Sequence, residues 1–248
     1  MSFHVVIPAR HASTRLPGKP LLEIAGRPMI WHVCQRALES GAARVVVATD
    51  DPRIAEAVGD FQVEACLTAA EHQSGTDRIA EVARILGWGD DEVVVNLQGD
   101  EPLMPPALLE RVARVLAEHP QAAMATLGVP LQAEEVFDSN AVKLVTDREG
   151  MALYFSRAPI PWKRGTFESG TADGAGMYRH LGLYAYRVGF LHRYVGWPPA
   201  PIEEQECLEQ LRVLWQGERI AVGIVDQAPP AGVDTEADYR RVQAHFSR

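Results

Sequence analysis

Three basic side chains follow the first apolar run of the chain at a spacing suited to a polyphosphate. Arg10, Arg15 and Lys19 are separated by five and four residues, with small residues between them and Gly18 next to Lys19. Arginine and lysine neutralise phosphate oxygens, and backbone N–H groups approach a phosphate closely where side chains are small. We therefore expect this loop to wrap a triphosphate, although charge alone is equally compatible with a solvated basic loop.

An acidic residue is expected to face this basic loop. Asp100 lies in N-L-Q-G-D-E-P at 96–102, directly after the apolar run at 92–97. In a doubly wound sheet the loops after the first and fourth strands meet at the switch point. A carboxylate beside phosphates is the usual setting for Mg²⁺, which keeps several waters and bridges protein and nucleotide. Without its neighbours in this motif, Asp100 would be read as a turn-forming aspartate.

The overall composition excludes several classes of function. The 248 residues carry 24 Lys+Arg and 33 Asp+Glu, a net charge of −9, and 47% of them are hydrophobic. This acidic balance argues against nucleic acid or an anionic membrane as partner. No apolar run approaches the roughly 20 residues of a membrane span. Cys34, Cys66 and Cys207 are isolated and form neither a disulfide framework nor a metal motif, so a globular cytoplasmic protein is expected, with Cys34 in its core.

Several common catalytic motifs are missing. The sequence has no G-x-x-x-x-G-K-[ST], no G-x-G-x-x-G after the first strand, no H-E-x-x-H, no C-x-x-C and no G-x-S-x-G. Kinase-like P-loops, simple dinucleotide enzymes and serine hydrolases therefore lose support.

The first half of the chain alternates between strand-like and helix-like segments. Strands are predicted at residues 5–7, 44–49, 63–67 and 92–97. Helices are predicted at 28–40, 76–86 and 105–118, and a short helix is predicted to begin at 52. Short β-branched runs between amphipathic helices are typical of a parallel sheet that is covered on both faces. The acid pairs at 50–51 and 90–91 fall where turns and helix caps are expected, so we interpret them as structural.

The second half breaks this rhythm. Strands are predicted at 141–145, 151–155, 180–186 and 220–225, and helices at 202–215 and 235–246. A Pro/Gly-rich stretch at 158–176 is typical of a mobile loop or a subdomain connection. We therefore predict a single α/β domain over 1–248. Its core comprises about 1–135 and 200–248, and a β-rich lobe is inserted at about 136–199.

Seven motifs in order resemble one enzyme family across nearly the whole chain. They are A-R-H-A-S-T-R-L-P-G-K-P-L at 9–21, H-Q-S-G-T-D-R at 72–78, N-L-Q-G-D-E-P at 96–102, Y-F-S-R-A-P-I-P-W at 154–162, R-H-L-G-L-Y at 179–184, L-E-Q-L-R at 208–212 and G-V-D-T at 232–235. The chain resembles the sugar nucleotidyltransferases that make CMP-activated sugar acids, most closely the CMP-Kdo synthetases, or 3-deoxy-manno-octulosonate cytidylyltransferases. The main departure lies at 162–176, a segment in which the family itself varies.

The resemblance implies a fold and a reaction. It implies a nucleotide-diphospho-sugar transferase-like, Rossmann-like fold, in which the core binds nucleotide and the lobe binds sugar and forms a homodimer. It also implies that CTP and Kdo give CMP-Kdo and pyrophosphate with Mg²⁺, for lipopolysaccharide biosynthesis. The anomeric hydroxyl attacks the α-phosphate directly, so no nucleophilic Ser or Cys is expected. For the dimer, the strand around 179–186 and its aromatics Tyr178, Tyr184 and Tyr186, expected to be exposed, form the predicted contact region.

The resemblance also assigns roles on the nucleotide side. Arg10 and Lys19 correspond to the triphosphate-binding and catalytic pair, together with Asp100, while Arg15 could instead position the loop. Asp100 and Asp234 correspond to metal ligands, although Asp234 or Thr235 also suits the N-cap of the last helix. Two further nucleotide contacts are implied, for which helix capping by Ser74 or Thr76 is the alternative: Ser74 and Arg78.

Six residues correspond to the sugar pocket of the family: Gln98, Arg157, His180, Tyr184, Glu209 and Gln210. Arg157 and His180 suit the sugar carboxylate, because a fork of donors or an imidazolium reads that group well. Glu209 and Gln210 lie on a predicted helix with an apolar face of Leu208, Leu211 and Trp215, from which they would reach the sugar hydroxyls.

Three alternatives remain open at the level of the sequence. The same chemistry could act on another acid sugar, such as 8-amino-Kdo or a sialic-acid type. The chain could be a catalytically silent nucleotide-binding protein, because a fold alone does not determine function. A glycosyltransferase would share the architecture, but its usual D-x-D metal motif is not found at 100–102.

Overall fold

The computed structural model describes residues 1–11, 16–72, 74–169 and 172–247. The chain forms two compact units. Unit 1 comprises Met1–Ala113, Ala185–Val195 and Pro229–Arg248, and unit 2 comprises Arg114–Tyr184 and Gly196–Ala228. This division differs from the expected one, because residues 114–135 and 200–228 belong to the second unit. Two strands from these segments pair with each other there, which the sequence analysis did not anticipate.

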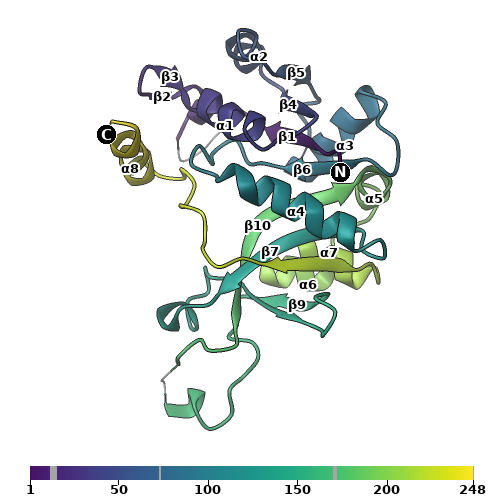
Figure 1. Ribbon diagram of the computed structural model, residues 1–248, viewed down its shortest axis with the longest axis vertical. Coiled ribbons are helices and arrows are strands. Elements are labelled where there is room, and N and C mark those ends of the chain that lie inside the picture. Colours follow the sequence, from purple (N-terminus) through teal and green to yellow (C-terminus); the bar gives the residue numbers. More distant parts are fainter. Residues whose placement is uncertain (12–15, 73, 170–171, 248) are drawn as a thin grey trace. The chain divides into compact units, whose positions relative to one another are not determined.

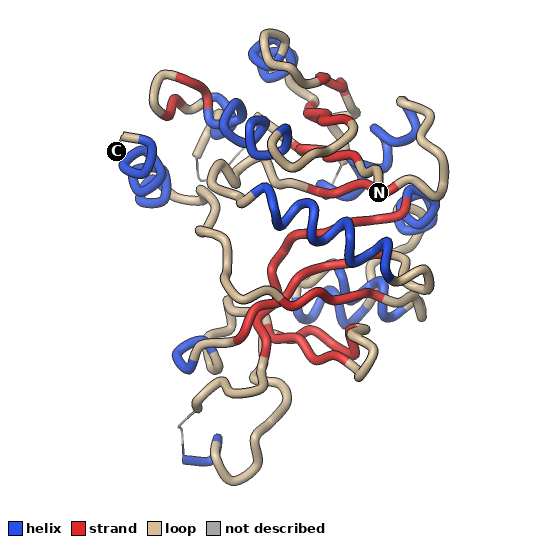
Figure 2. Tube along the Cα trace, in the orientation of Figure 1, coloured by secondary structure: helices blue, strands red, loops and turns tan. Residues whose placement is uncertain are grey.

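Unit 1 contains the parallel sheet that the alternating pattern predicted (Figure 1, Figure 2). Strands β1 (His4–Pro8), β4 (Arg44–Thr49), β5 (Glu64–Leu67) and β6 (Val93–Asn96) run in the order β6-β1-β4-β5. Val5 lies opposite Val45 on one side and Val95 on the other. All three valines are buried, as β-branched residues of a covered parallel sheet should be.

The loops after β1 and β6 are brought together by this strand order, as expected at a topological switch point. Their backbones lie so close that a Cβ at Gly99 would be 2.8 Å from the carbonyl oxygen of Pro8. Only glycine fits such a close approach. The glycine of N-L-Q-G-D-E-P therefore allows the residue that follows it, Asp100, to lie next to the loop after β1.

The helices of unit 1 agree closely with the periodic segments of the sequence. They are α1 (Met29–Leu38), α2 (Pro52–Val58), α3 (Gly75–Ile85), α5 (Val188–Tyr194) and α8 (Glu236–Phe246), and α4 (Pro106–Glu118) begins in this unit. Asp51 caps α2 by accepting a hydrogen bond from the backbone of Arg53, which confirms a structural role for that aspartate. Cys34 is fully buried in α1, as expected. The sequence pattern did not predict α5 or the short elements η1 (Lys19–Leu21), β2 (Glu23–Ile24) and β3 (Arg27–Pro28).

Unit 2 contains a mixed sheet, with parallel and antiparallel strand pairs, and two short helices. Its strands are β7 (Met124–Pro130), β8 (Lys143–Thr146), β9 (Ala152–Ser156), β10 (Tyr178–Arg187, whose last three residues belong to unit 1) and β11 (Ile220–Ile224). They run in the order β11-β7-β10, with β8 on β10 and β9 on β8. β11 is parallel to β7, whereas β8 is antiparallel to both β9 and β10. The strand β7 was missed, and η2 (Ala133–Glu135) and η3 (Phe167–Ser169) complete the unit.

The single helix predicted at 202–215 is wrong. Two helices occupy the segment, α6 (Pro201–Glu206) and α7 (Gln210–Trp215), because Cys207 takes a left-handed conformation with φ 50° and ends α6. A bidentate ion pair between the buried Glu203 and Arg212, with contacts of 2.8 and 2.5 Å, holds the two helices across this break. As a result Trp215, expected on the buried apolar face, is 56% exposed.

The exposure of the aromatic residues on β10 is also partly different from expectation. Tyr178 and Tyr184 keep partial exposure, but Tyr186 is only 4% exposed. Tyr186 is therefore a core residue and is not part of an exposed contact region. Among the described residues, no helix is both long and apolar enough to cross a membrane.

Candidate active site

Lys19 joins three segments of unit 1 that are far apart in the sequence. Its Nζ donates to Asp100 Oδ2 at 2.7 Å, to the Val233 carbonyl at 2.9 Å and to Asp234 Oδ1 at 3.3 Å. The side chains are 15% exposed for Lys19, 30% for Asp100 and 52% for Asp234. One cation and two carboxylates from the predicted catalytic and metal-binding positions thus meet at one point.

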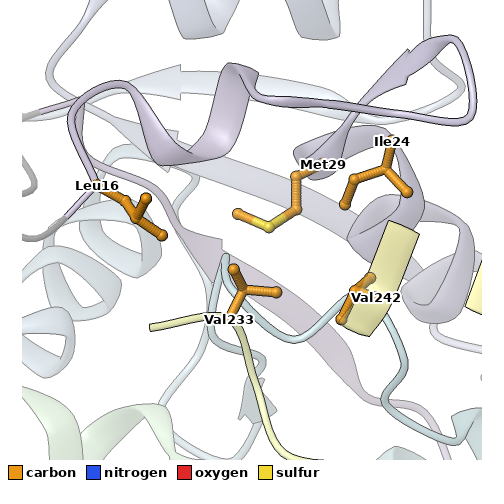
Figure 3. Packing of buried hydrophobic residues seen from close by; sticks show 5 residues of the cluster. All are labelled: Leu16, Ile24, Met29, Val233 and Val242. Atoms are coloured by element: carbon orange, nitrogen blue, oxygen red, sulfur yellow. The ribbon is translucent and has the colours of Figure 1, made fainter. Parts of the chain in front are cut away.

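An apolar cluster holds the 232–235 segment beside Lys19. Val233 packs with Leu16, Ile24, Met29 and Val242, as Figure 3 shows. Its backbone N–H donates to the Asp100 carbonyl at 2.8 Å, so the segment is tied to both partners of the ion pair.

The N-cap of α8 is one of the two residues considered for that position. Thr235 is the N-cap, because its hydroxyl accepts from the backbone N–H of Asp238. The carboxylate of Asp234 instead lies against Lys19, 3.3 Å from its Nζ.

The two acids fit a magnesium ion only in combination with a nucleotide. No group of three or more His, Cys, Asp or Glu residues in the described ranges is placed to hold a metal. Mg²⁺, however, is commonly held by one or two carboxylates together with substrate phosphates and water. Asp100 and Asp234 already converge on a single ammonium group, so their oxygens meet that requirement.

The remaining nucleotide-side predictions have mixed placements. Arg10 is exposed after β1, and Arg15 lies outside the described residues. Ser74 caps α3 in a reciprocal capping box with Asp77, the alternative considered for it. Arg78 is 4% exposed and pairs with Asp50 at 3.3 Å and with the Thr68 hydroxyl.

Part of the predicted sugar pocket surrounds a cavity of about 470 Å³ within unit 2. His180, Tyr184 and Gln210 line it, together with Arg179 and two acids, Glu135 and Asp138. The other predicted sugar residues do not belong to this lining. Gln98 lies in unit 1, where its amide donates to Asn96, and Glu209 is exposed at the start of α7.

Arg157 braces the wall of the cavity. Its guanidinium donates to the carbonyls of Glu206 at 2.7 Å and Ser139 at 2.9 Å. Its backbone N–H and the Ser156 hydroxyl are held by the Glu206 carboxylate at 2.9 and 2.6 Å. Arg157 therefore ties α6 to the loop at 138–141, which lines the cavity.

Burial lowers the pKa of His180 to about 3, which favours the neutral imidazole. Its Nε2 lies 2.9 Å from the Thr126 hydroxyl. The ring packs edge-on against Phe155, with centroids 4.9 Å apart. In the protein without substrates, burial therefore disfavours the imidazolium that we expected to bind a carboxylate.

Comparison with known proteins places the chain in a family. Residues 4–220 match the Cytidylyltransferase family. The 3-deoxy-manno-octulosonate cytidylyltransferases of Aeromonas hydrophila and Aeromonas salmonicida are 58% and 57% identical, each over 98% of both chains. The enzyme of that name from Methylococcus capsulatus is 57% identical over 99% of this chain and 97% of its own length. The chain belongs to the 3-deoxy-manno-octulosonate cytidylyltransferase family.

A solved structure supports the same assignment. The structure of a CMP:2-keto-3-deoxy-manno-octonic acid synthetase complexed with CTP superposes with a TM-score of 0.90 at 42% identity, covering 100% of this chain and 99% of the other. The α/β fold expected from the resemblance is therefore confirmed.

Three polar residues of this cytidylyltransferase were missed by the sequence analysis. Lys143 is fully buried, and its Nζ donates to the carbonyls of Asp138 and Ala141 at 2.7 and 2.6 Å. Arg179 lines the cavity and pairs with Glu135 at 2.6 Å, and the buried Thr126 contacts His180. A lysine inside an apolar strand was the only one of these signals visible in the sequence, because the other contacts depend on strand pairing.

Proposed function

We propose that the protein transfers CMP from CTP to the anomeric hydroxyl of Kdo, giving CMP-Kdo and pyrophosphate for lipopolysaccharide biosynthesis. The observation that carries this proposal is the full-length identity with enzymes of that name, in a chain where Lys19 lies between Asp100 and Asp234.

The residues of unit 1 suit a direct displacement at phosphorus. The Lys19 ammonium, together with the exposed Arg10, supplies positive charge for the phosphate oxygens of CTP. Bound between Asp100, Asp234 and the phosphates, Mg²⁺ would supply further neutralisation of the charge that develops on the leaving pyrophosphate. Such a reaction depends on positioning and charge stabilisation.

No covalent intermediate is needed for this chemistry. Cys34 is an unsuitable nucleophile, because burial raises the pKa of its thiol to about 12. The attacking group is the sugar hydroxyl, and the cavity of unit 2 offers it neutral partners in His180, Tyr184 and Gln210.

One assay tests the reaction and its alternatives. Pyrophosphate release is measured with each of the four nucleoside triphosphates, with and without Kdo, and with 8-amino-Kdo or a sialic acid in place of Kdo. We expect release only with CTP plus Kdo and a divalent cation, and none after EDTA is added. Faster pyrophosphate release with another acid sugar would show that this sugar, and not Kdo, is the preferred substrate. No release with any sugar would reject the proposed function.

We further propose that the protein is a cytoplasmic homodimer. The three cysteines are free thiols, which fits a reducing compartment. The dimer is supported by the family resemblance and by the partly exposed Tyr178 of β10. Sedimentation at micromolar concentration should give twice the chain mass of 27.3 kDa, and a monomer would reject the dimer.

A further inference from the structure

The hydroxyl of Thr126 lies beneath His180 in a setting that has only one satisfactory proton arrangement. Thr126 is on β7 and fully buried. Its Oγ1 is 3.0 Å from the Leu181 carbonyl, 2.9 Å from the Leu183 carbonyl and 2.9 Å from Nε2 of His180. Carbonyl oxygens only accept hydrogen bonds, so the single hydroxyl proton is needed by the two carbonyls. The imidazole nitrogen must then interact with the lone pairs of the hydroxyl oxygen.

The two possible arrangements differ in energy for a simple reason. If the hydroxyl shares its proton between the two carbonyls, its oxygen accepts a hydrogen bond from Nε2–H and all three contacts are satisfied. If the hydroxyl donates to Nε2, its lone pairs face two carbonyl oxygens at about 3 Å with no proton between them. Buried polar atoms left without a partner are costly, so the first arrangement is favoured.

This arrangement determines what His180 presents on its other side. With the proton on Nε2, the lone pair is on Nδ1. Nδ1 has no hydrogen-bond partner among the described residues, and His180 lines the cavity with Tyr184 and Gln210. A neutral ring in this tautomer accepts a hydrogen bond at Nδ1 and has no N–H left to donate to a carboxylate.

We propose that Thr126 is a positioning residue, whose hydroxyl holds His180 as the Nε2–H tautomer so that Nδ1 accepts a hydrogen bond from a sugar hydroxyl. This inference rests on the proposed function for the identity of the sugar.

The protonation state is tested first, without any substrate. In protein labelled with ¹⁵N-histidine, long-range ¹H–¹⁵N spectra distinguish the two neutral tautomers and the imidazolium, and His180→Gln assigns the signal. We expect a neutral ring with its proton on Nε2 from pH 6 to pH 8. A proton on Nδ1, or an imidazolium at pH 7, overturns the proposal even if every variant fails to fold.

Kinetics of three variants then test the consequence. Thr126→Val keeps the shape but removes the hydroxyl, Thr126→Ser keeps the hydroxyl, and Thr146→Val makes the same change on β8 away from the cavity lining. For Thr126→Val we expect a mixture of tautomers and a KM for Kdo raised about three- to tenfold, as for one lost hydrogen bond, with the KM for CTP within about twofold. Thr126→Ser and Thr146→Val should behave like the parent protein.

The outcomes separate this proposal from the proposed function. A folded Thr126→Val protein that keeps both the tautomer and the KM for Kdo overturns the role of Thr126. A loss of affinity for both substrates also overturns it, because that result indicates a general structural defect. Failure of the parent protein to release pyrophosphate with CTP and Kdo rejects the proposed function and leaves the tautomer measurement as an independent result.

Discussion

Replacing Asp100 by asparagine should separate catalysis from stability. Asp100→Asn keeps the size of the side chain and one oxygen that accepts from Lys19, but removes the negative charge from one of the two acids at the site. The neighbouring Asp234 keeps its contact with Lys19 at 3.3 Å. The perturbation is therefore confined to the charge that the metal and the triphosphate require.

The expected loss of stability is small. A charge-assisted hydrogen bond is about twice as strong as a neutral one, so the change from carboxylate to amide costs about 1 kcal/mol in a pair that is partly exposed. For a chain of this length that corresponds to a fall in Tm of about 2–4 °C. The activity should fall by at least about 100-fold, because a metal ligand contributes several kcal/mol of charge stabilisation in the transition state.

Glu101→Gln is the matched control. Burial, together with the charge of Asp100, raises the pKa of Glu101 to about 8, so this carboxyl is neutral at pH 7 and an amide resembles it. We expect the turnover of Glu101→Gln at pH 7 within about twofold of the parent protein. Both variants are compared by pyrophosphate release across a Mg²⁺ titration and by thermal unfolding in EDTA.

Two results would refute this reasoning. Activity of Asp100→Asn within a fewfold of the parent protein would show that the carboxylate is not a metal ligand. A fall in Tm of more than about 10 °C would show that the ion pair with Lys19 is chiefly structural, because about 1 kcal/mol accounts for no more than about 4 °C.

Three further predictions follow from groups elsewhere in the protein. Lys143→Met should lower Tm by about 4–8 °C, as for about 2 kcal/mol lost when two buried carbonyls lose their donor, and an unchanged Tm would contradict a stabilising role of Lys143. Because those carbonyls belong to residues 138 and 141, which line the cavity, the KM for Kdo should also rise while the KM for CTP stays unchanged. Because burial raises the pKa of Glu101 in the folded protein from the ordinary glutamate value of 4.5 to about 8, its protonated carboxyl stabilises the fold fully below about pH 4.5. That contribution is lost as the pH rises through about 8. The Tm of the parent protein measured in EDTA should therefore decline relative to Glu101→Gln over this interval, and a constant difference would contradict the raised pKa. Arg157→Ala should raise the KM for Kdo about tenfold or more and leave the KM for CTP unchanged, whereas a variant that loses CTP affinity alone would place the sugar pocket elsewhere.

The amino-acid sequence by itself determined the parallel sheet and the meeting of its two functional loops. Buried parallel strands must be apolar on both faces, so β1, β4 and β6 are visible as β-branched runs. Once those strands are recognised, the strand order of a doubly wound sheet brings Lys19 and Asp100 together, although they are 81 residues apart. Helix caps such as Asp51 are equally predictable from the sequence, since they depend on residues only two or three positions away.

The tertiary structure decided what depends on long-range pairing and burial. Thr235, and not Asp234, caps α8, and Asp234 reaches Lys19 across 215 positions of sequence. The helix break at Cys207 is not predictable from a glycine or proline, because neither residue occurs there. The ion pair between Glu203 and Arg212 stabilises the break. The charge state of His180 follows from burial in the folded protein, because desolvation disfavours an imidazolium that would be common in a solvated strand. Local sequence carries propensity and periodicity, whereas these features depend on which distant groups share a low-dielectric environment.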